Sequence, residues 1–357
     1  MPLQAPPQHR LCYVSRNYIV SNMARINTEN LLEEWGAVNL GSAQMHSKNM
    51  VWGFLHNLWG IVGYTFRVRR GDIVVLQYPI KKYFKYICRV ARLRGALTVT
   101  LIHDLGCMRR HRITEQVELS RLSLSDYIIA TNSVMRTWCE EHGLSQTIGA
   151  LELWDYPSPM PLRKQESMPA DGSRKPVVVY AARLHPRRNA FLTKLEHTDL
   201  TYELHLYGQN DTTPFGKDNP NIHEHPRMAS DTFIETVCGD YGLMWDGNSI
   251  NRLDGAWGEY NRINTPMKVS FYLRSGMPVI INKDAALAPL IEKEGVGIVI
   301  DDLDRLGDIL THITPEQRQA MTDNVARIQQ RINNGYYLQQ TIEQAMAHLA
   351  ARHTNND

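Results

Sequence analysis

Cysteine is scarce in this sequence, and its pattern excludes two common kinds of small module. The five cysteines are widely spread, and no two of them stand in a CxxC spacing. We therefore predict neither a zinc module nor a disulfide framework, and a reducing compartment fits better. The longest apolar stretch, Val51–Tyr64, is interrupted by Gly, His and Asn and is too short to span a bilayer.

Several targeting and binding motifs are missing as well. The first residues, MPLQAPPQHR, lack the apolar core of a secretory signal, so we expect a cytoplasmic location, with contact to the inner face of the cell membrane as an option. Neither GxGxxG after a first strand nor GxxxxGK[ST] occurs, which removes the main support for dinucleotide dehydrogenases and P-loop enzymes. The basic residues form no recognisable nucleic-acid module, so nucleic acid is not an expected partner.

The composition is that of an ordinary globular protein with length for two domains. The chain has 357 residues, 43% of them hydrophobic. Its net charge of +2 is unevenly placed. Residues 1–150 carry 18 Lys and Arg against 10 Asp and Glu, whereas residues 151–357 carry 21 against 27. A basic first half and an acidic second half suggest two modules that face different partners.

Short β-branched runs alternate with helical stretches, a pattern typical of parallel sheets covered by helices. We predict an α/β chain with two Rossmann-like domains, residues 1–157 and 177–335, and a linker at 158–176. The last helix, 336–357, is predicted to pack back on the first domain. Ligands of such open sheets bind beyond the carboxyl ends of the strands, so we expect the site in a cleft between two facing domains.

A polar loop, SRNYIVSNMARIN, follows the first predicted strand. Its polar and basic side chains could bind a sugar or a phosphate through charge-assisted hydrogen bonds. The alternative is a solvated loop with a helix cap. The candidate acceptor-binding residues are Arg16, Asn17, Asn22 and Arg25.

The strand end LIHDLG places His103 and Asp104 where a strand meets its loop. A carboxylate and an imidazole at this edge are suited to act as general base on a sugar hydroxyl. Equally, Asp104 could cap the next helix while His103 is a core side chain.

The densest group of candidate residues follows the apolar run GLMW, which ends in Asp246 and Gly247. We expect a glycine-containing loop after it, holding Gly255, Gly258, Tyr260 and Asn264. A helix is then predicted with Thr265 as its N-cap and Pro266 as its first residue. Lys268 falls in the first turn, where free N–H groups, the helix dipole and a cation together favour an anion.

The segment Val51–Trp59 adds aromatic side chains to the basic first half. With nearby cations it could rest on an anionic membrane leaflet. The alternative is that the aromatic residues belong to the core and that the cations form a solvated face. The cations are Arg67, Arg69, Arg70, Lys81, Lys82 and Lys85.

Two motifs in the second half resemble those of a known family. WDGNS and GEYNRINTPMKVSFYLRSGMPVII are similar to the signature of bacterial GT-B glycosyltransferases. That group includes β-galactofuranosyltransferases and the streptococcal glucosyltransferase that acts on serine-rich adhesins. Further similar segments follow in order through the chain: SNMARIN, GDIVVLQYP, LIHDL, LWDYPSP, VVVYAARL, ELHLYG and AALAPLIEKEGVGIVI.

The resemblance implies a GT-B fold, a UDP-sugar donor held by the second domain, and neither a cofactor nor an essential metal. It implies contacts of Lys268 and Asn264 with the diphosphate and the nucleotide, with Tyr260 nearby. Arg183 stands where the family has a donor-contacting residue, but Ala-Ala-Arg-Leu replaces the usual Ala-Gly-Asn-Leu, so Arg187 or Arg188 could serve instead. Thr-Pro-Met also replaces Asn-Pro-His before the lysine. The remaining donor-binding candidates are Tyr207, Asp246 and Gly247.

The function predicted from the resemblance is hexose transfer, with galactofuranose as first candidate, to a glycan or lipid-linked glycan of the cell surface. Inversion is implied, with Asp104 or else His103 as base. Lys268 and an arginine of the 183–188 segment would neutralise the leaving UDP. A UDP-glucose-dependent glucosyltransferase, a nucleotide-sugar epimerase and a non-catalytic GT-B partner subunit are the alternatives. Relatives that self-associate suggest a homo-oligomer.

Overall fold

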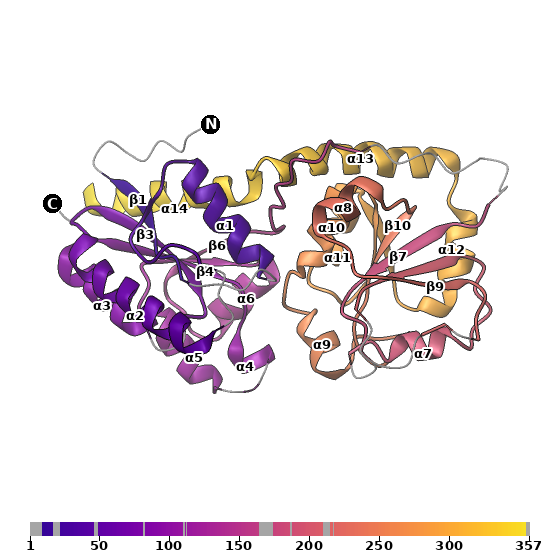
Figure 1. Ribbon diagram of the computed structural model, residues 1–357, viewed down its shortest axis with the longest axis horizontal. Coiled ribbons are helices and arrows are strands. Elements are labelled where there is room, and N and C mark those ends of the chain that lie inside the picture. The colour runs from indigo at the N-terminus through magenta and orange to yellow at the C-terminus, as the bar shows by residue number, and fades with distance from the viewer. Residues whose placement is uncertain are drawn as a thin grey trace. The chain divides into compact units, whose positions relative to one another are not determined.

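The computed structural model describes residues 9–16, 22–45, 49–80, 83–109, 111, 113–163, 174–185, 188–209, 215–216 and 218–354. The chain divides into two compact units, an N-terminal unit of residues 1–155 with 335–357 and a C-terminal unit of residues 156–334. Each unit holds one six-stranded sheet whose neighbouring strands are all parallel (Figure 1). The prediction of two Rossmann-like domains is confirmed.

In the N-terminal unit the strand order is β2-β1-β3-β4-β5-β6. All seven residues of β3 are buried, as expected for a central parallel strand covered on both faces. The strands are β1 (Arg10–Tyr13), β2 (Val38–Asn39), β3 (Asp72–Tyr78), β4 (Leu97–Ile102), β5 (Tyr127–Ala130) and β6 (Thr147–Ala150). The helices are α1 (Met23–Glu34), α2 (Met50–Arg67), α3 (Phe84–Arg94), α4 (Gly106–Arg109), α5 (Glu115–Leu122), α6 (Ser133–Glu141) and α14 (Tyr336–Thr354).

In the C-terminal unit the order is β12-β11-β10-β7-β8-β9, so that β7 and β10 are central neighbours. The strands are β7 (Val177–Ala181), β8 (Glu203–Tyr207), β9 (Ile222–His225), β10 (Tyr241–Met244), β11 (Val279–Asn282) and β12 (Gly297–Ile300). The helices are α7 (Phe191–Leu195), α8 (Ser230–Thr236), α9 (Gly255–Tyr260), α10 (Met267–Arg274), α11 (Ala288–Glu294), η1 (Leu303–Arg305), α12 (Leu306–His312) and α13 (Pro315–Asn333).

The last two helices belong to different units. A capping box formed by Thr314 and Gln317 starts α13, which packs on α10. The helical run is interrupted at Gly335, whose φ of 74° is a left-handed conformation that favours glycine. After it, α14 packs against β5 and β6 of the N-terminal unit, where Thr147 Oγ1 lies 3.0 Å from Nε2 of His348. The predicted return of the last helix is confirmed.

The described ends of the predicted linker at 158–176 are held by the C-terminal unit. The backbone N–H of Ser158 donates to Asn333 Oδ1 at 3.0 Å. Arg163 Nη1 donates to the carbonyl of Val237 at 2.8 Å. These bonds fix the first part of the segment on its own unit.

Two local predictions in the candidate site segment are wrong. The expected loop around Gly255 and Gly258 is the short helix α9, although glycine is a poor helix former. Close packing calls for glycine at position 258, because a Cβ there would lie 2.9 Å from the carbonyl oxygen of Asp246. Packing therefore outweighs the low helix propensity of glycine. The next helix begins at Met267, with Pro266 rather than Thr265 as N-cap. Pro266 has an extended ψ of 131°, which places it outside the helix.

Helix α2 exposes large apolar side chains, among them Trp52 at 66%, Trp59 at 75% and Phe66 at 76%. It packs beside α3 (Figure 1). The hydroxyl groups of Tyr86, on that helix, and Thr65 lie 2.7 Å apart. Within the described ranges, no helix has both the length and the apolar character needed to cross a membrane.

Candidate active site

Four polar side chains converge at the carboxyl ends of β7 and β10 in the C-terminal unit. Asp246 lies two residues beyond the end of β10 and is buried. Its Oδ1 atom lies 3.2 Å from Nζ of Lys268 and 3.4 Å from Nε of Arg188. The hydroxyl of Tyr180, on β7, donates to the same oxygen at 3.1 Å. One carboxylate thus faces two cations, which leaves the group with a net positive charge.

The ionisation of this group follows from its burial and its charges. Burial alone would raise the pKa of Asp246, but the charges of Lys268 and Arg188 outweigh it and lower that pKa. Burial, together with repulsion from Arg188, lowers the pKa of Lys268 to about 8 in spite of Asp246. At neutral pH the carboxylate is ionised and most of Lys268 is protonated.

Neighbouring side chains hold the two cations in place. The Nζ atom of Lys268 lies 4.6 Å from the ring centroid of Tyr180, and Cζ of Arg188 lies 4.3 Å from that of Trp257. The Tyr180 hydroxyl accepts a hydrogen bond from Asn189 Nδ2 at 2.6 Å. The cations are therefore oriented before any ligand arrives, which lowers the entropy cost of binding an anion.

The turn after β10 requires glycine for a backbone reason. Gly247 has a φ of 121°, and a Cβ there would lie 2.5 Å from the carbonyl oxygen of Asp254. Its N–H donates to the carbonyl of Arg188 at 3.1 Å, and its own carbonyl accepts from the N–H of Phe191 at 3.2 Å. These two backbone hydrogen bonds hold the segment that contains Arg188 beside Asp246.

Lys268 lies in the first turn of α10, as predicted. A cation at a helix N-terminus is unfavourable by itself. The ion pair with Asp246 is a structural reason for the presence of Lys268 there. Asp246 cannot neutralise Arg188 as well, so an anion-binding capacity remains at this helix start.

The other predicted donor residues occupy three different places. Tyr260 is buried at the end of α9, and Asn264 follows it, with Oδ1 buried and unpaired among the described residues. A buried acceptor of this kind is suited to a ligand N–H or O–H. Arg183 is exposed after β7. The ring of Tyr207 stacks on that of His225, with ring centroids 4.5 Å apart, and no contact in the described ranges joins Tyr207 to Asp246. Arg187 lies outside the described residues.

The candidate bases follow β4 in the N-terminal unit, and the structure places them differently. Asp104 is part-exposed and pairs with Arg109 of α4. His103 is 8% exposed and stacks on Trp154 with ring centroids 4.6 Å apart. Burial and the Arg25 charge keep the pKa of His103 well below its usual value, so its ring is neutral. Its Nε2 atom has no hydrogen-bond partner within the described part of the chain.

The predicted acceptor residues lie near the carboxyl edge of the same sheet or just before α1. Arg25 Nη1 donates to the carbonyl of Gln77, at the end of β3, at 2.7 Å. The carbonyl of Arg16 accepts a hydrogen bond from the Gln44 side chain. Asn22 is the exposed N-cap residue of α1, and its side chain makes no capping hydrogen bond. Asn17 lies outside the described residues.

The sequence reasoning missed Glu29, a buried carboxyl group on α1. It accepts hydrogen bonds from Ser15 Oγ at 2.6 Å, from Gln44 Nε2 at 2.9 Å and from Gln77 Nε2 at 3.1 Å. Burial nevertheless raises its pKa to about 7. The spacing of four residues from Arg25 was the available signal, since both then share one helix face. With Arg25, these residues form a polar cluster suited to a hydroxyl-rich ligand.

Comparison with known families shows that both halves of the chain match the models of one family. A family model described as "Glucosyltransferase 3-like, N-terminal domain" matches residues 12–153, and its C-terminal counterpart matches residues 178–345. The chain belongs to the glucosyltransferase 3-like family. This confirms the resemblance stated from the motifs, and it makes the chain a member of a family of glycosyltransferases.

Curated relatives of this glucosyltransferase 3-like chain match most of its length. The β-1,6-galactofuranosyltransferase WbbI of Escherichia coli K12 is 28% identical over 282 residues, 79% of this chain and 81% of the relative. Glucosyltransferase 3 of Streptococcus gordonii is 24% identical over 309 residues, 82% of each chain.

Solved structures agree on the fold of the glucosyltransferase 3-like chain. The lipopolysaccharide galactosyltransferase WaaB matches with a TM-score of 0.62 at 14% identity, covering 94% of this chain and 99% of that one. Anabaena HepE, solved with UDP-glucose, matches with a TM-score of 0.58 at 14% identity, covering 96% and 99%. The chain therefore has the GT-B fold.

Proposed function

We propose that the chain transfers a hexose, galactofuranose as first candidate, from a UDP-sugar to a glycan acceptor in the synthesis of a cell-surface polysaccharide or glycoconjugate. The observation that carries the proposal is the cluster of Lys268, Arg188 and Asp246, whose net charge is positive. Its place beyond the carboxyl ends of β7 and β10 is the edge where open α/β sheets bind nucleotides. The name of the 28% identical relative supports the sugar, and the UDP-glucose complex of HepE supports the nucleotide.

In this proposal the C-terminal unit stabilises the leaving group. As the bond between the anomeric carbon and the diphosphate oxygen breaks, negative charge grows on UDP. Lys268, Arg188 and the first-turn N–H groups of α10 are suited to neutralise that charge, because they are already oriented and partly dehydrated. Two cations and a helix N-terminus supply this without a metal ion, so we propose metal-independent transfer.

The N-terminal unit supplies the acceptor site and the base. The acceptor hydroxyl oxygen attacks the anomeric carbon from the face opposite UDP, which inverts the configuration, and its proton passes to the base. We propose Asp104 for this role because its carboxylate is part-exposed at a strand end. His103, which is neutral and whose Nε2 has no partner among the described residues, is the alternative. Asp104→Asn and His103→Asn distinguish them, since the base variant alone should lose transfer while UDP binding persists.

The donor is tested by assaying the full chain with EDTA and a panel of donors. We expect transfer from UDP-galactofuranose, with UDP-glucose as the competing donor suggested by the streptococcal relative. Product analysis by NMR reports the anomeric configuration. Retention would contradict inversion, and loss of activity in EDTA that Mg²⁺ or Mn²⁺ restores would contradict metal independence. UDP-sugar interconversion without an acceptor would indicate an epimerase.

Helix α2 supports a second part of the proposal, attachment to an anionic membrane leaflet that carries a lipid-linked acceptor. Its exposed Trp52, Trp59 and Phe66 suit the interfacial region of a bilayer. The adjoining α3 exposes basic side chains, and Arg94 of that helix donates to the carbonyl of Thr65 on α2 at 3.2 Å. Apolar and basic groups on adjacent helices favour anionic lipid over a protein partner.

Vesicle co-sedimentation tests this attachment. We expect binding to phosphatidylglycerol vesicles, weaker binding to phosphatidylcholine vesicles, and loss of both on replacing Trp52 and Trp59 with Ser. Full binding by that double variant would refute the proposal. Light scattering on the same samples checks the predicted homo-oligomer, and a dimer lost in the double variant without any vesicle binding would assign the face to a second copy.

A further inference from the structure

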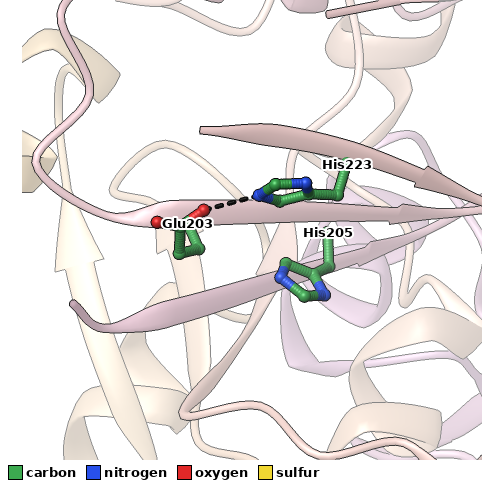
Figure 2. A group of neighbouring side chains, drawn as sticks. All are labelled: Glu203, His205 and His223. Carbon is green, nitrogen blue, oxygen red and sulfur yellow. Dashed lines mark hydrogen bonds and ion pairs between the residues drawn. The ribbon is translucent and has the colours of Figure 1, made fainter. Parts of the chain in front are cut away.

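We propose that Glu203, His205 and His223 form a binding site for one divalent transition-metal ion, zinc in the first instance, on one face of the C-terminal sheet. The three residues come from β8 and the edge strand β9, which pair in parallel. Figure 2 shows the two imidazole rings and the carboxylate grouped on neighbouring strands. One nitrogen or oxygen atom from each lies within 4.8 Å of those of the other two.

The strand geometry explains why these side chains meet. Side chains two residues apart in a strand point to the same face, so Glu203 and His205 share a face, with Leu204 directed into the core behind them. The register places His205 directly beside His223. Their ring centroids lie 5.0 Å apart. The polar face is thus a consequence of the pairing of β8 with β9.

The donor atoms suit zinc. Two imidazoles and one carboxylate form a ligand set that zinc commonly uses, with a fourth position left for water. Nε2 of His223 lies 2.6 Å from Oε2 of Glu203. Tetrahedral zinc holds its ligand atoms roughly 3.3 Å apart, so small side-chain rotations are enough to admit the ion. The side chains of His223 and Glu203 are 42% and 28% exposed, which gives the ion a path from solvent.

A fourth residue is placed to orient one ligand. Nδ1 of His205 lies 3.1 Å from Nε2 of His225. With that nitrogen engaged, Nε2 of His205 is the atom left for the metal, and such a partner fixes the tautomer and orientation of a ligating histidine.

This cluster is separate from the group proposed to bind the donor. Within the described ranges no contact joins Glu203, His205 or His223 to Asp246. The ion would stabilise the pairing of the edge strand β9 with β8. This role is compatible with metal-independent transfer at the donor group. The proposal does not rest on the transferase activity.

Isothermal titration of the untagged, metal-stripped full chain with ZnCl2 tests the site, with MgCl2 in parallel. We expect one zinc ion per chain and no Mg²⁺ binding, a higher melting temperature with zinc, and visible Co²⁺ absorption typical of tetrahedral coordination. His205→Ala and His223→Ala should abolish that absorption. His225→Ala, a positioning variant, should weaken zinc binding by about 10–100-fold.

His197→Ala is the matched control, because His197 is an exposed histidine of the same unit outside the cluster. It should bind zinc as the unaltered chain does. Far-UV circular dichroism checks that each variant is folded. The proposal is overturned if the folded His205→Ala and His223→Ala variants bind zinc with unchanged affinity and stoichiometry, or if the unaltered chain binds none.

Discussion

At the scale of single residues, Lys268 connects the local chemistry to the function. The dipole of a helix makes a lysine unfavourable in its first turn. Lys268 is tolerated there because the carboxylate of Asp246 lies 3.2 Å from its Nζ atom. Asp246 is shared with Arg188, and the surplus positive charge is what a diphosphate would neutralise. The family motif predicted Lys268, whereas the Asp246 pair needed the fold, because the two residues stand 22 positions apart.

Replacing Lys268 by Met should lower kcat/KM for the UDP-sugar by about 10²–10³-fold, the usual cost of losing one oriented group that stabilises transition-state charge. Asp246 keeps Arg188 as a partner, so the variant should remain folded. Steady-state kinetics measure the effect, with Lys293→Met as control, since Lys293 is exposed on α11. Equal kcat/KM in the Lys268 variant and the unaltered chain would exclude Lys268 from the site.

The affinity for UDP should fall as the pH rises through about 8, where Lys268 loses its proton and its charge. Calorimetric titration with UDP between about pH 7 and pH 9 measures this. Lys268→Arg should move the decline to higher pH, because a guanidinium stays charged. If the variant and the unaltered chain show the same decline, another group controls the binding.

At the scale of elements, the apolar strands were predictable and the polar ones were not. β3 (DIVVLQY) and β10 (YGLM) are short apolar runs, a pattern that indicates buried strands of a parallel sheet. β9 has the sequence IHEH, whose alternation carries no apolar signal, so the sequence reasoning missed it. The proposed zinc site was hidden for the same reason, because His205 and His223 become neighbours only through the pairing of β8 and β9.

Helix α1 should make stability depend on pH through Glu29. Its pKa is about 7 in the folded chain and about 4.5 when exposed, so the folded state binds the proton more tightly. The resulting stabilisation is present below pH 4.5 and is lost as the pH rises through 7, up to about 3 kcal/mol in all. Glu29→Gln should reduce this decline, as measured by urea unfolding at several pH values. Glu33→Gln, exposed on the same helix, should leave it unchanged.

The stability of helix α14 should depend on Asp155, a buried residue whose carboxyl oxygens accept hydrogen bonds from the backbone N–H groups of Tyr337 at 3.3 Å and Leu338 at 2.7 Å. Asp155→Ala should lower the free energy of unfolding by about 1–2 kcal/mol, because it leaves these N–H groups without their cap. Thermal unfolding measures the loss, and hydrogen exchange should localise it to α14. Unchanged exchange in α14 would show that its docking does not need this cap.

At the scale of the whole molecule, the two units carry different parts of the proposed reaction. The division was predictable, since the alternation of strands and helices stops at the linker and the net charge changes sign beyond it. The position of the donor group was predictable as well, because parallel sheets bind ligands at their carboxyl edges. The sugar was not, since discrimination among hexoses rests on a few hydrogen bonds that motifs do not place.

The most direct test of the central claim is a thermal-shift panel in EDTA with UDP, four UDP-sugars, GDP-mannose and NAD, on the unaltered chain and on Lys268→Met. The sugars are galactofuranose, galactopyranose, glucose and GlcNAc. We expect UDP and one UDP-sugar to stabilise the unaltered chain, by about 2.7 kcal/mol at a hundredfold excess over the dissociation constant, with no shift from NAD. Lys268→Met should lose most of that stabilisation. No shift with any uridine nucleotide, or equal shifts in both proteins, would contradict a UDP-sugar site at Lys268.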